Sequence, residues 1–130
     1  MGRLIVFEGP DKSGKSTQMK KVAERLSSSY KVATFHFPNY DSPTGSRIKS
    51  ILMDKENDYR NCLSTVMNFA VLQIEDKVNC RDTLKKMLSE NDFVILDRLT
   101  ISSIVFDEVT LKRLMTLPNG PTIDKVNEAI

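Results

Sequence analysis

The hydrophobic pattern of the chain alternates between short apolar runs and longer amphipathic segments. The runs are rich in β-branched, aromatic and aliphatic side chains, which predicts strands. These predicted strands lie at about residues 3–7, 31–37 and 93–96. Residues 93–96, Phe-Val-Ile-Leu, are apolar throughout, and a strand that is buried on both faces is typical of the centre of a parallel sheet.

Between the runs, apolar residues recur at helical spacing. The predicted helices lie at about residues 15–28, 47–53, 63–88 and 109–115, the third being one long helix or two with a bend. Residues 39–45 are expected to form a loop and residues 118–121 a turn, followed by a final helix from Thr122. Strands that alternate with helices indicate an α/β fold, a parallel sheet with flanking helices, in a single domain over residues 1–130.

Composition and charge narrow the class of protein. The 130 residues suit one domain, and 40% hydrophobic with 28% charged residues is ordinary for a globular protein. The net charge is +2 with scattered Lys and Arg, so no nucleic-acid or membrane partner is expected. Because the first predicted strand begins at about residue 3, no signal peptide is expected. Cys62 and Cys80 lack metal-ligand spacing and are expected to be free thiols, which favours a cytoplasmic location.

One octapeptide, Gly9-Pro10-Asp11-Lys12-Ser13-Gly14-Lys15-Ser16, carries the clearest chemical signal. It fits the pattern G-x-x-x-x-G-K-[ST] at every fixed position, between a predicted strand and a predicted helix. The backbone N–H groups of such a loop and the following helix N-terminus face a phosphate. Lys15 would neutralise the β- and γ-phosphates of a nucleotide, and the Ser16 hydroxyl would be a Mg²⁺ ligand. The alternative is a surface loop before a helix, but the flanking pattern favours nucleotide binding.

Asp97 and Arg98 directly follow the third predicted strand. Ligands of open α/β sheets bind at the carboxyl ends of the strands, so Asp97 is expected beside the phosphate-binding loop. There it could hold Mg²⁺ through water or orient the phosphate acceptor, the alternative being a cap of the next segment. Arg98 can donate two hydrogen bonds to a phosphate, the alternative being a surface arginine. His36 is expected to be a strand residue without a chemical role.

Four blocks together resemble the thymidylate kinase family, close in form to its eukaryotic and poxviral branch. They are Phe7-Glu8-Gly9-x-Asp11-Lys12-Ser13-Gly14-Lys15-Ser16-Thr17, Phe37-Pro38 with Gly45, Phe69-Ala70 with Glu75, and Asp97-Arg98-x-x-x-Ser102 with Phe106. The resemblance implies a P-loop nucleoside monophosphate kinase fold. It also implies transfer of the γ-phosphoryl group of ATP, with Mg²⁺, to dTMP or a related deoxynucleoside monophosphate, a step toward dTTP. The same resemblance implies a homodimer that forms through helices.

The resemblance implies roles for the residues that match the family's motifs. The ATP phosphates would be held by Gly9, Asp11, Lys12, Ser13, Gly14, Lys15, Ser16 and Thr17, and Mg²⁺ by Ser16 and Asp97. Asp11 would contact the deoxyribose 3′-hydroxyl, Lys12 would stabilise charge on the transferring phosphoryl group, and Arg98 would bind the monophosphate. Phe69 would stack on the thymine ring, and the nucleoside pocket would include Phe37, Gln73, Ser102 and Phe106. By spacing alone, Phe69 and Phe106 would be core residues, Ser102 a helix cap, and Asp11 and Lys12 solvated charges.

The chain also departs from the family's pattern. Gln73 stands where an arginine usually meets the base, and an amide lacks that charge and reach. Tyr40, Leu99 and Ser103 stand where the family has an arginine, an aromatic residue and a glycine. Family members continue with an arginine-bearing lid and two more strands, so the fold is expected to be truncated. One edge of the first strand would then be unpaired, unless the tail of the chain or a partner chain covers it. Three hypotheses stay open: an active dTMP kinase, a catalytically impaired nucleotide-binding fragment or paralogue, and another P-loop deoxynucleoside or nucleotide kinase.

Overall fold

Three parallel strands carry the fold in the described part of the chain. The structure, a computed structural model, describes residues 1–117, 120, 122 and 124, without the side chain of Phe106. The strands are β1 (Arg3–Phe7), β2 (Val32–His36) and β3 (Phe93–Asp97). The predicted turn at 118–121 and the predicted final helix fall mostly outside the described residues, as does the predicted pocket contact of the Phe106 side chain.

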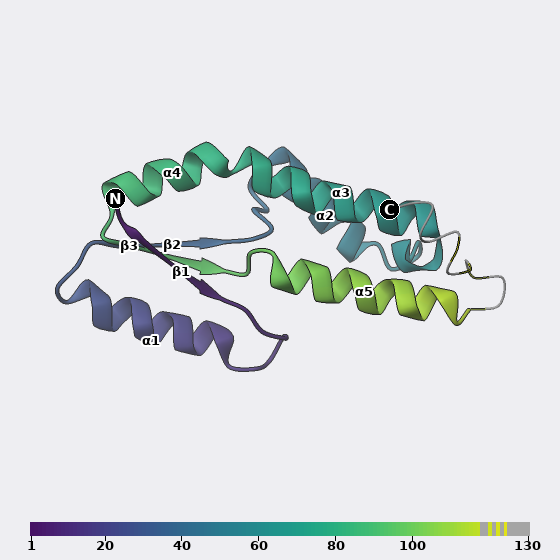
Figure 1. Cartoon of the computed structure of the whole chain (residues 1–130), viewed down its shortest axis with the longest axis horizontal. Coiled ribbons are helices and arrows are strands. Elements are labelled where there is room, and N and C mark those ends of the chain that lie inside the picture. The colour runs from purple at the N-terminus through teal and green to yellow at the C-terminus, as the bar shows by residue number, and fades with distance from the viewer. Residues whose placement is uncertain (118–119, 121, 123, 125–130) are drawn as a thin grey trace.

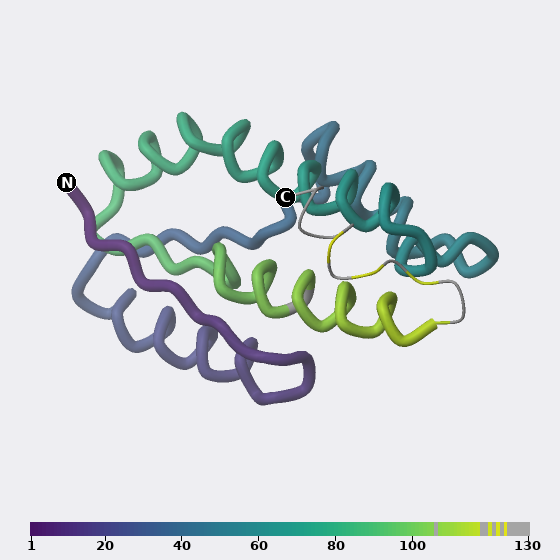
Figure 2. Tube along the Cα trace, turned by 45° about the vertical axis from the view of Figure 1, so that its right-hand side comes forward, coloured from purple at the N-terminus to yellow at the C-terminus, as the bar shows by residue number. Residues whose placement is uncertain are grey.

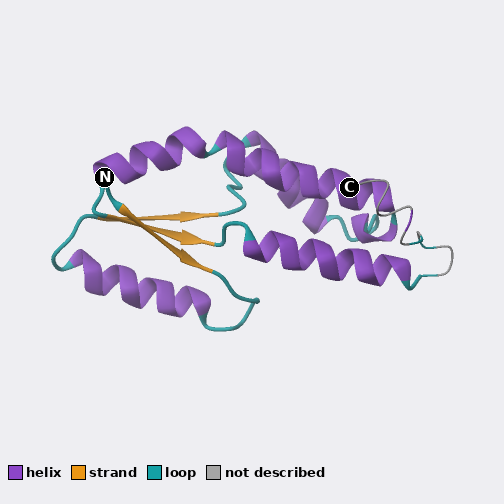
Figure 3. Ribbon diagram, in the orientation of Figure 1, coloured by secondary structure: helices purple, strands orange, loops and turns teal. Residues whose placement is uncertain are grey.

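The sheet has the order β1-β3-β2 among the described residues, so β3 is central, as its apolar sequence predicts. Val94, Ile95 and Leu96 are fully buried because helices cover both faces of this strand (Figure 3). The register pairs both Phe7 of β1 and His36 of β2 with Asp97 of β3. All three strands therefore end level, and the side chains that follow them meet at one edge.

Helices flank the sheet and extend beyond it. They are α1 (Lys15–Ser27), α2 (Pro43–Met53), α3 (Leu63–Asn79), α4 (Arg81–Glu90) and α5 (Ile101–Met115), with a short 3₁₀ turn η1 (Tyr59–Asn61). Figure 1 shows α1 on one face of the sheet and α4 on the other, with α2, α3 and α5 gathered beyond the carboxyl ends of the strands. In Figure 2 the chain leaves β1, turns sharply and reverses direction into α1. The carboxyl edge of the sheet therefore lies between the phosphate-binding loop and this helical group.

Two apolar clusters hold these layers together. One joins α4 to the sheet and contains Phe37, Cys80, Val94 and Leu96, with Leu84, Met87 and Leu88 packed against it. The other joins α2 to α3 and contains Ile48, Phe69 and Leu72, with Ile51 and Tyr59 packed against it. Cys62 and Cys80 are both free thiols, as predicted. The clusters place buried side chains of α3 next to the cavity described below.

Three helix boundaries differ from the sequence prediction. The helix predicted at 47–53 begins four residues earlier, because the Ser42 hydroxyl accepts a hydrogen bond from Gly45 N at 2.9 Å and Pro43 suits the first helical position. The long segment at 63–88 is two helices that meet at Cys80. The helix predicted at 109–115 is the second half of α5, whose first turn is held by Glu8 from across the fold. Local patterning cannot reveal that last contact.

Within the described residues, β1 has a strand partner on its β3 side alone. Leu4 and Val6 of this strand are 44% and 36% exposed. The expected unpaired edge of the strand that leads into the phosphate-binding loop is therefore present in the described part of the fold. No helix in that part is both long and apolar enough to cross a lipid bilayer.

Candidate active site

The phosphate-binding loop joins β1 to α1 and has the backbone conformation its sequence predicts. Lys12 has a φ of 61° and Gly14 a φ of 84°, and Gly14 occupies the position before the first residue of α1. Such left-handed residues turn successive backbone N–H groups toward one concave side. A Cβ on Gly9 would lie 3.2 Å from Ser13 Oγ, so the loop also folds closely on itself.

A cavity of about 390 Å³ lies over this loop. We call it the phosphate cavity. Its walls come from the loop, the first turn of α1 and the ends of β2 and β3. They include Pro10, Asp11, Lys12, Gly14, Lys15, Ser16, Thr17, His36, Asp97 and Arg98. The structure therefore brings six of the eight predicted loop residues together with Asp97 and Arg98, although β1 and β3 are far apart in sequence. The other two, Gly9 and Ser13, belong to the loop but are not among the lining residues.

Asp97 binds two basic side chains at the carboxyl edge of the sheet. Lys15 Nζ lies 2.6 Å from its Oδ1, and His36 Nδ1 lies 3.0 Å from its Oδ2. Partial burial acts to raise the pKa of Asp97, but hydrogen bonds and charge from Lys15 and His36 outweigh it and lower that pKa. His36 is the last residue of β2, in agreement with the expectation of a strand residue, and its ring also meets Asp97 and lines the cavity. The available signal was its place at the end of β2.

Arg98 and Asp11 form a second ion pair in front of the loop. Arg98 Nη2 lies 2.6 Å from Asp11 Oδ1. Arg98 has a φ of 68°, and its backbone N–H donates to Phe7 O at 2.9 Å. This left-handed turn directly after β3 sends the guanidinium toward the phosphate-binding loop, where a bidentate phosphate contact is chemically suitable.

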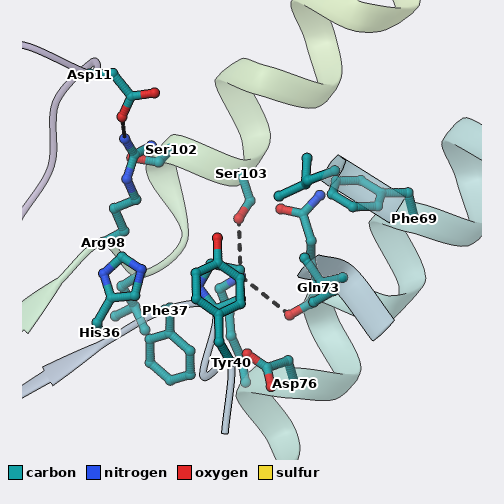
Figure 4. Close-up of a pocket in the computed structure, with 15 residues that line it drawn as sticks. Asp11, His36, Phe37, Tyr40, Phe69, Gln73, Asp76, Arg98, Ser102 and Ser103 are labelled. Carbon is teal, nitrogen blue, oxygen red and sulfur yellow. Dashed lines mark hydrogen bonds and ion pairs between the residues drawn. The ribbon is translucent and has the colours of Figure 1, made fainter. Parts of the chain in front are cut away.

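A second cavity of about 280 Å³ adjoins the first, between the sheet edge and the helices beyond it. We call it the nucleoside-side cavity. Figure 4 shows Asp11 and Arg98 at one end and Phe69 and Gln73 at the other. Its walls include the predicted pocket residues Phe37, Phe69, Gln73 and Ser102. Asp11, His36 and Arg98 line both cavities, so these three residues form the passage from one to the other.

Two of the three aromatic residues predicted for this cavity, Phe37 and Phe69, are also core residues. Phe69 is 3% exposed, and its ring stacks on Tyr59 with 4.4 Å between centroids. Phe37 is equally buried and meets Phe35 edge to face at 5.2 Å. Each of these two side chains is packed in the core and also borders the cavity, so the core interpretation and the pocket interpretation are compatible. Stacking of Phe69 on a nucleobase stays a prediction.

Polar groups of α3 and α5 meet at the far end of the nucleoside-side cavity. Gln73 Nε2 donates to Asp107 Oδ1 at 3.3 Å. Lys77 Nζ donates to Ser103 Oγ at 3.0 Å and to the Gln73 carbonyl oxygen at 3.3 Å. Burial lowers the pKa of Lys77, against the nearby negative charges, and burial raises the pKa of Asp107. Sequence reasoning missed Lys77, whose one signal was its place one helical turn after Gln73.

Ser102 is held by a carboxylate that precedes the phosphate-binding loop. Its hydroxyl and its backbone N–H both donate to Glu8 Oε2, and Leu99 N donates to Glu8 Oε1 at 2.8 Å. Burial acts to raise the pKa of Glu8, but these hydrogen bonds, led by the Ser102 hydroxyl, outweigh it and lower that pKa. Ser102 is the second residue of α5 and not its cap, so the helix-cap alternative was wrong.

The loop before α2 is fastened to α3 by a buried carboxylate. Asp76 is 1% exposed and accepts hydrogen bonds from Asn39 N at 2.8 Å, Ser42 Oγ at 2.8 Å and Thr44 Oγ1 at 2.9 Å. Gly45 packs against the same turn so closely that a Cβ on it would lie 1.7 Å from Asn39 O. These contacts fix the loop that carries Tyr40 to the mouth of the nucleoside-side cavity.

The donors predicted for Mg²⁺ fit that ion as a partial site. Ser16 and Asp97 both line the phosphate cavity and offer hard oxygen donors. Within the described residues, no group of three or more His, Cys, Asp and Glu could hold a metal. Mg²⁺ typically takes one or two protein oxygens and completes its shell with water and substrate phosphates. The residues present therefore suit a Mg²⁺ ion that arrives with a nucleotide.

Comparison with known proteins gives a consistent result. A family model described as thymidylate kinase matches residues 7–119. The thymidylate kinase of Finegoldia magna is 33% identical over 107 residues, which cover 82% of this chain and 51% of that protein. The thymidylate kinase of Schizosaccharomyces pombe is 32% identical over 109 residues, covering 81% of this chain and 48% of that protein.

Solved structures agree with these relatives. The thymidylate kinase of Candida albicans superposes with a TM-score of 0.73 at 26% identity, covering 98% of this chain and 54% of that one. A GTPase of Pyrococcus abyssi superposes with a TM-score of 0.56 at 19% identity, a likeness of fold alone. The chain thus spans about half the length of the relatives it matches and corresponds to their N-terminal part.

Proposed function

Because the chain belongs to the thymidylate kinase family, we propose that it transfers the γ-phosphoryl group of ATP to dTMP and releases ADP and dTDP. ATP would bind with its phosphates in the phosphate cavity, and dTMP would occupy the nucleoside-side cavity. The observation that carries the proposal is the passage formed by Asp11, His36 and Arg98, which line both cavities. A phosphoryl group can move directly between two substrates only where their binding sites meet.

The proposed reaction depends on position and charge. In-line phosphoryl transfer needs little covalent chemistry from the protein, and alignment of the two substrates supplies much of the catalysis. Lys15 would exchange Asp97 for β- and γ-phosphate oxygens, while Lys12 would face the transferring group. Arg98 would exchange Asp11 for an oxygen of the monophosphate, which leaves the Asp11 carboxylate for the deoxyribose 3′-hydroxyl.

A bound Mg²⁺ would neutralise charge that develops on the phosphate oxygens, with Ser16 and Asp97 as its protein ligands. His36 would keep one oxygen of Asp97 fixed while the other is freed by Lys15. Phe37 and Phe69 would bury the faces of the nucleobase away from water. Ser102, held by Glu8, would line the same pocket near the sugar.

A coupled assay for ADP release tests the proposal. Pure, folded chain with ATP and Mg²⁺ should release ADP when dTMP is added, and Lys15→Ala should not. Lys20→Ala is the matched control, because Lys20 lies on the same helix, 78% of its side chain is exposed, and its carboxylate contact to Glu24 is 4.0 Å long. Absence of ADP release from folded protein would contradict the kinase activity. Equal rates with thymidine and dTMP would instead favour a deoxynucleoside kinase.

A second candidate function is nucleotide binding without useful turnover. It is favoured by Gln73 and Tyr40, which stand where the family usually has arginines that contact the base and a phosphate. Calorimetric titration separates the two functions, since a binding module would bind ATP and dTMP yet release no ADP when both are present. The prediction of a homodimer is tested in the same preparation by sedimentation. A second copy would have an apolar surface to cover on α3, where Val71, Ile74 and Val78 are exposed at helical spacing.

A further inference from the structure

We propose that Lys77 is a specificity-determining residue of the nucleoside-side cavity, selecting a nucleobase that presents a carbonyl oxygen to its ammonium group. The inference rests on the proposed function, since it concerns which deoxynucleoside monophosphate this cavity takes. It starts from a cation that is partly buried in a cavity wall and that the phosphate chemistry leaves unused.

Lys77 is placed to meet a ligand. Its Nζ donates to Ser103 Oγ on α5 and to the Gln73 carbonyl oxygen on α3, and it lies 5.9 Å from the centroid of the Phe37 ring. Figure 4 shows the two residues that hold this ammonium group, Ser103 and Gln73, and the dashed lines of their hydrogen bonds. An ammonium group has three N–H donors, so the described oxygens leave one donor for a ligand atom.

Among the described contacts, Lys77 makes no ion pair with a carboxylate. Its described hydrogen-bond partners are neutral oxygens. Three carboxylates, Asp76, Asp107 and Glu8, are near enough to favour its charge, but each of them accepts hydrogen bonds from other groups. Partial burial of a cation costs free energy unless polar partners compensate. A ligand oxygen beside Lys77 would supply that compensation, and the same cost would be left uncompensated beside a ligand that offers only a donor.

The cavity assigns different tasks to its two strong cations. Arg98 lines both cavities and faces the phosphate-binding loop, whereas Lys77 lines the nucleoside-side cavity and is not among the described residues of the phosphate cavity. Arg98 is therefore the cation for the monophosphate. Lys77 Nζ donates to the carbonyl oxygen of Gln73. Figure 4 shows Gln73 and Phe69 at the opposite end of the cavity from Arg98, where the nucleobase would lie.

The chemistry of an ammonium group determines which base it favours. Lysine donates hydrogen bonds and cannot accept them. Thymine and uracil carry a carbonyl oxygen at the ring position where cytosine carries an amino group. Lys77 would bind the carbonyl and leave the amino group of cytosine without an acceptor, so dTMP and dUMP are expected to bind more tightly than dCMP.

The test measures dissociation constants of dTMP, dCMP and thymidine by calorimetry, on the full chain and its variants. The unmodified protein should prefer dTMP to dCMP. Lys77→Met should reduce this preference by roughly tenfold or more, the size of one charge-assisted hydrogen bond. Lys77→Arg should retain most of it. Lys86→Met is the matched control, an exposed lysine of α4 whose carboxylate contact to Glu90 is 4.0 Å long, and it should match the unmodified protein.

Ser103→Ala is a second variant in case Lys77→Met does not fold. It removes the oxygen that orients Lys77 and should also reduce the preference for dTMP over dCMP. An unchanged preference in the folded variants would overturn the inference. So would a loss confined to the preference for dTMP over thymidine, since that would make Lys77 a phosphate ligand. Failure of the unmodified protein to bind any of the three compounds would instead contradict the proposed function itself.

Discussion

Lys15 and Asp97 face each other across the carboxyl edge of the sheet, with 2.6 Å between Nζ and Oδ1. The cation that the loop would offer to phosphate is thus already paired with a carboxylate. Under the proposed function, a phosphate would replace that carboxylate at Lys15, and the released carboxylate oxygen would become free for another cation. This one ion pair would then couple phosphate binding to metal binding.

Lys15→Ala should abolish the rise in melting temperature that ATP produces. The variant removes the cation that meets the phosphates, so the nucleotide loses most of its preference for the folded state. Thermal unfolding with and without saturating ATP measures this effect, and Lys20→Ala should keep the full ATP-dependent rise. An unchanged rise in Lys15→Ala would remove Lys15 from the binding site.

Arg98→Gly should be more stable than Arg98→Ala by about 1 kcal/mol, the cost of a left-handed conformation for a residue with a Cβ. Both variants lose the ion pair to Asp11, so their difference reports the backbone at a φ of 68°. Urea unfolding measures the two free energies. Equal free energies of unfolding for the two variants would show that the turn after β3 relaxes. In either case, both variants should bind dTMP more weakly than the unmodified protein.

Gly45→Ala should reduce the free energy of unfolding by roughly 2–3 kcal/mol, a typical cost of overpacking a rigid site. The added Cβ would lie 1.7 Å from Asn39 O, a backbone atom that cannot turn aside as a side chain can. Ser46→Ala, an exposed change in the next position of α2, should stay within about 0.5 kcal/mol of the unmodified protein. A Gly45→Ala variant as stable as Ser46→Ala would contradict the close packing of this loop.

Glu8→Gln should reduce stability by about 1–2 kcal/mol near neutral pH, the contribution of hydrogen bonds to a charged acceptor. The pKa of Glu8 is lowered by folding from an ordinary value of 4.5. Its contribution is therefore complete above about pH 4.5 and is lost as the pH falls through the lowered value. Urea unfolding measures the free energies of unfolding of the unmodified protein and of Glu8→Gln, and their difference should be smaller at about pH 3 than at about pH 6. A difference that does not change with pH would mean that the charge of Glu8 does not stabilise the first turn of α5.

The strands, the phosphate-binding loop and the place of Asp97 could be predicted from the sequence because they depend on local patterns. An apolar run that ends in Asp97 needs little more than the rule that parallel strands end together at one edge. The bend at Cys80 was within the prediction as one of two alternatives. The start of α2 was not, because the Ser42 cap and Pro43 lie within a segment rich in loop-forming residues.

Other parts of the site depend on contacts between distant segments. His36 acquires its partner only because β2 and β3 end at the same level. The first turn of α5 is stabilised by Glu8, and Lys77 meets Ser103 only after α3 and α5 pack together. No local sequence pattern predicts these contacts between distant segments. The sequence therefore predicted the residues that line the phosphate cavity better than those at the far end of the nucleoside-side cavity.

Glu8 directly precedes the phosphate-binding loop. Its carboxylate accepts hydrogen bonds from the backbone N–H groups of Leu99 and Ser102, which line the nucleoside-side cavity. A loop that tightens around phosphate would therefore pull on the wall of the neighbouring cavity through a single side chain. Any such influence must run in both directions, because a change in affinity between two ligands is reciprocal. Binding of one proposed substrate would then change the affinity for the other before any phosphoryl transfer. Glu8→Gln would make the two affinities more nearly independent.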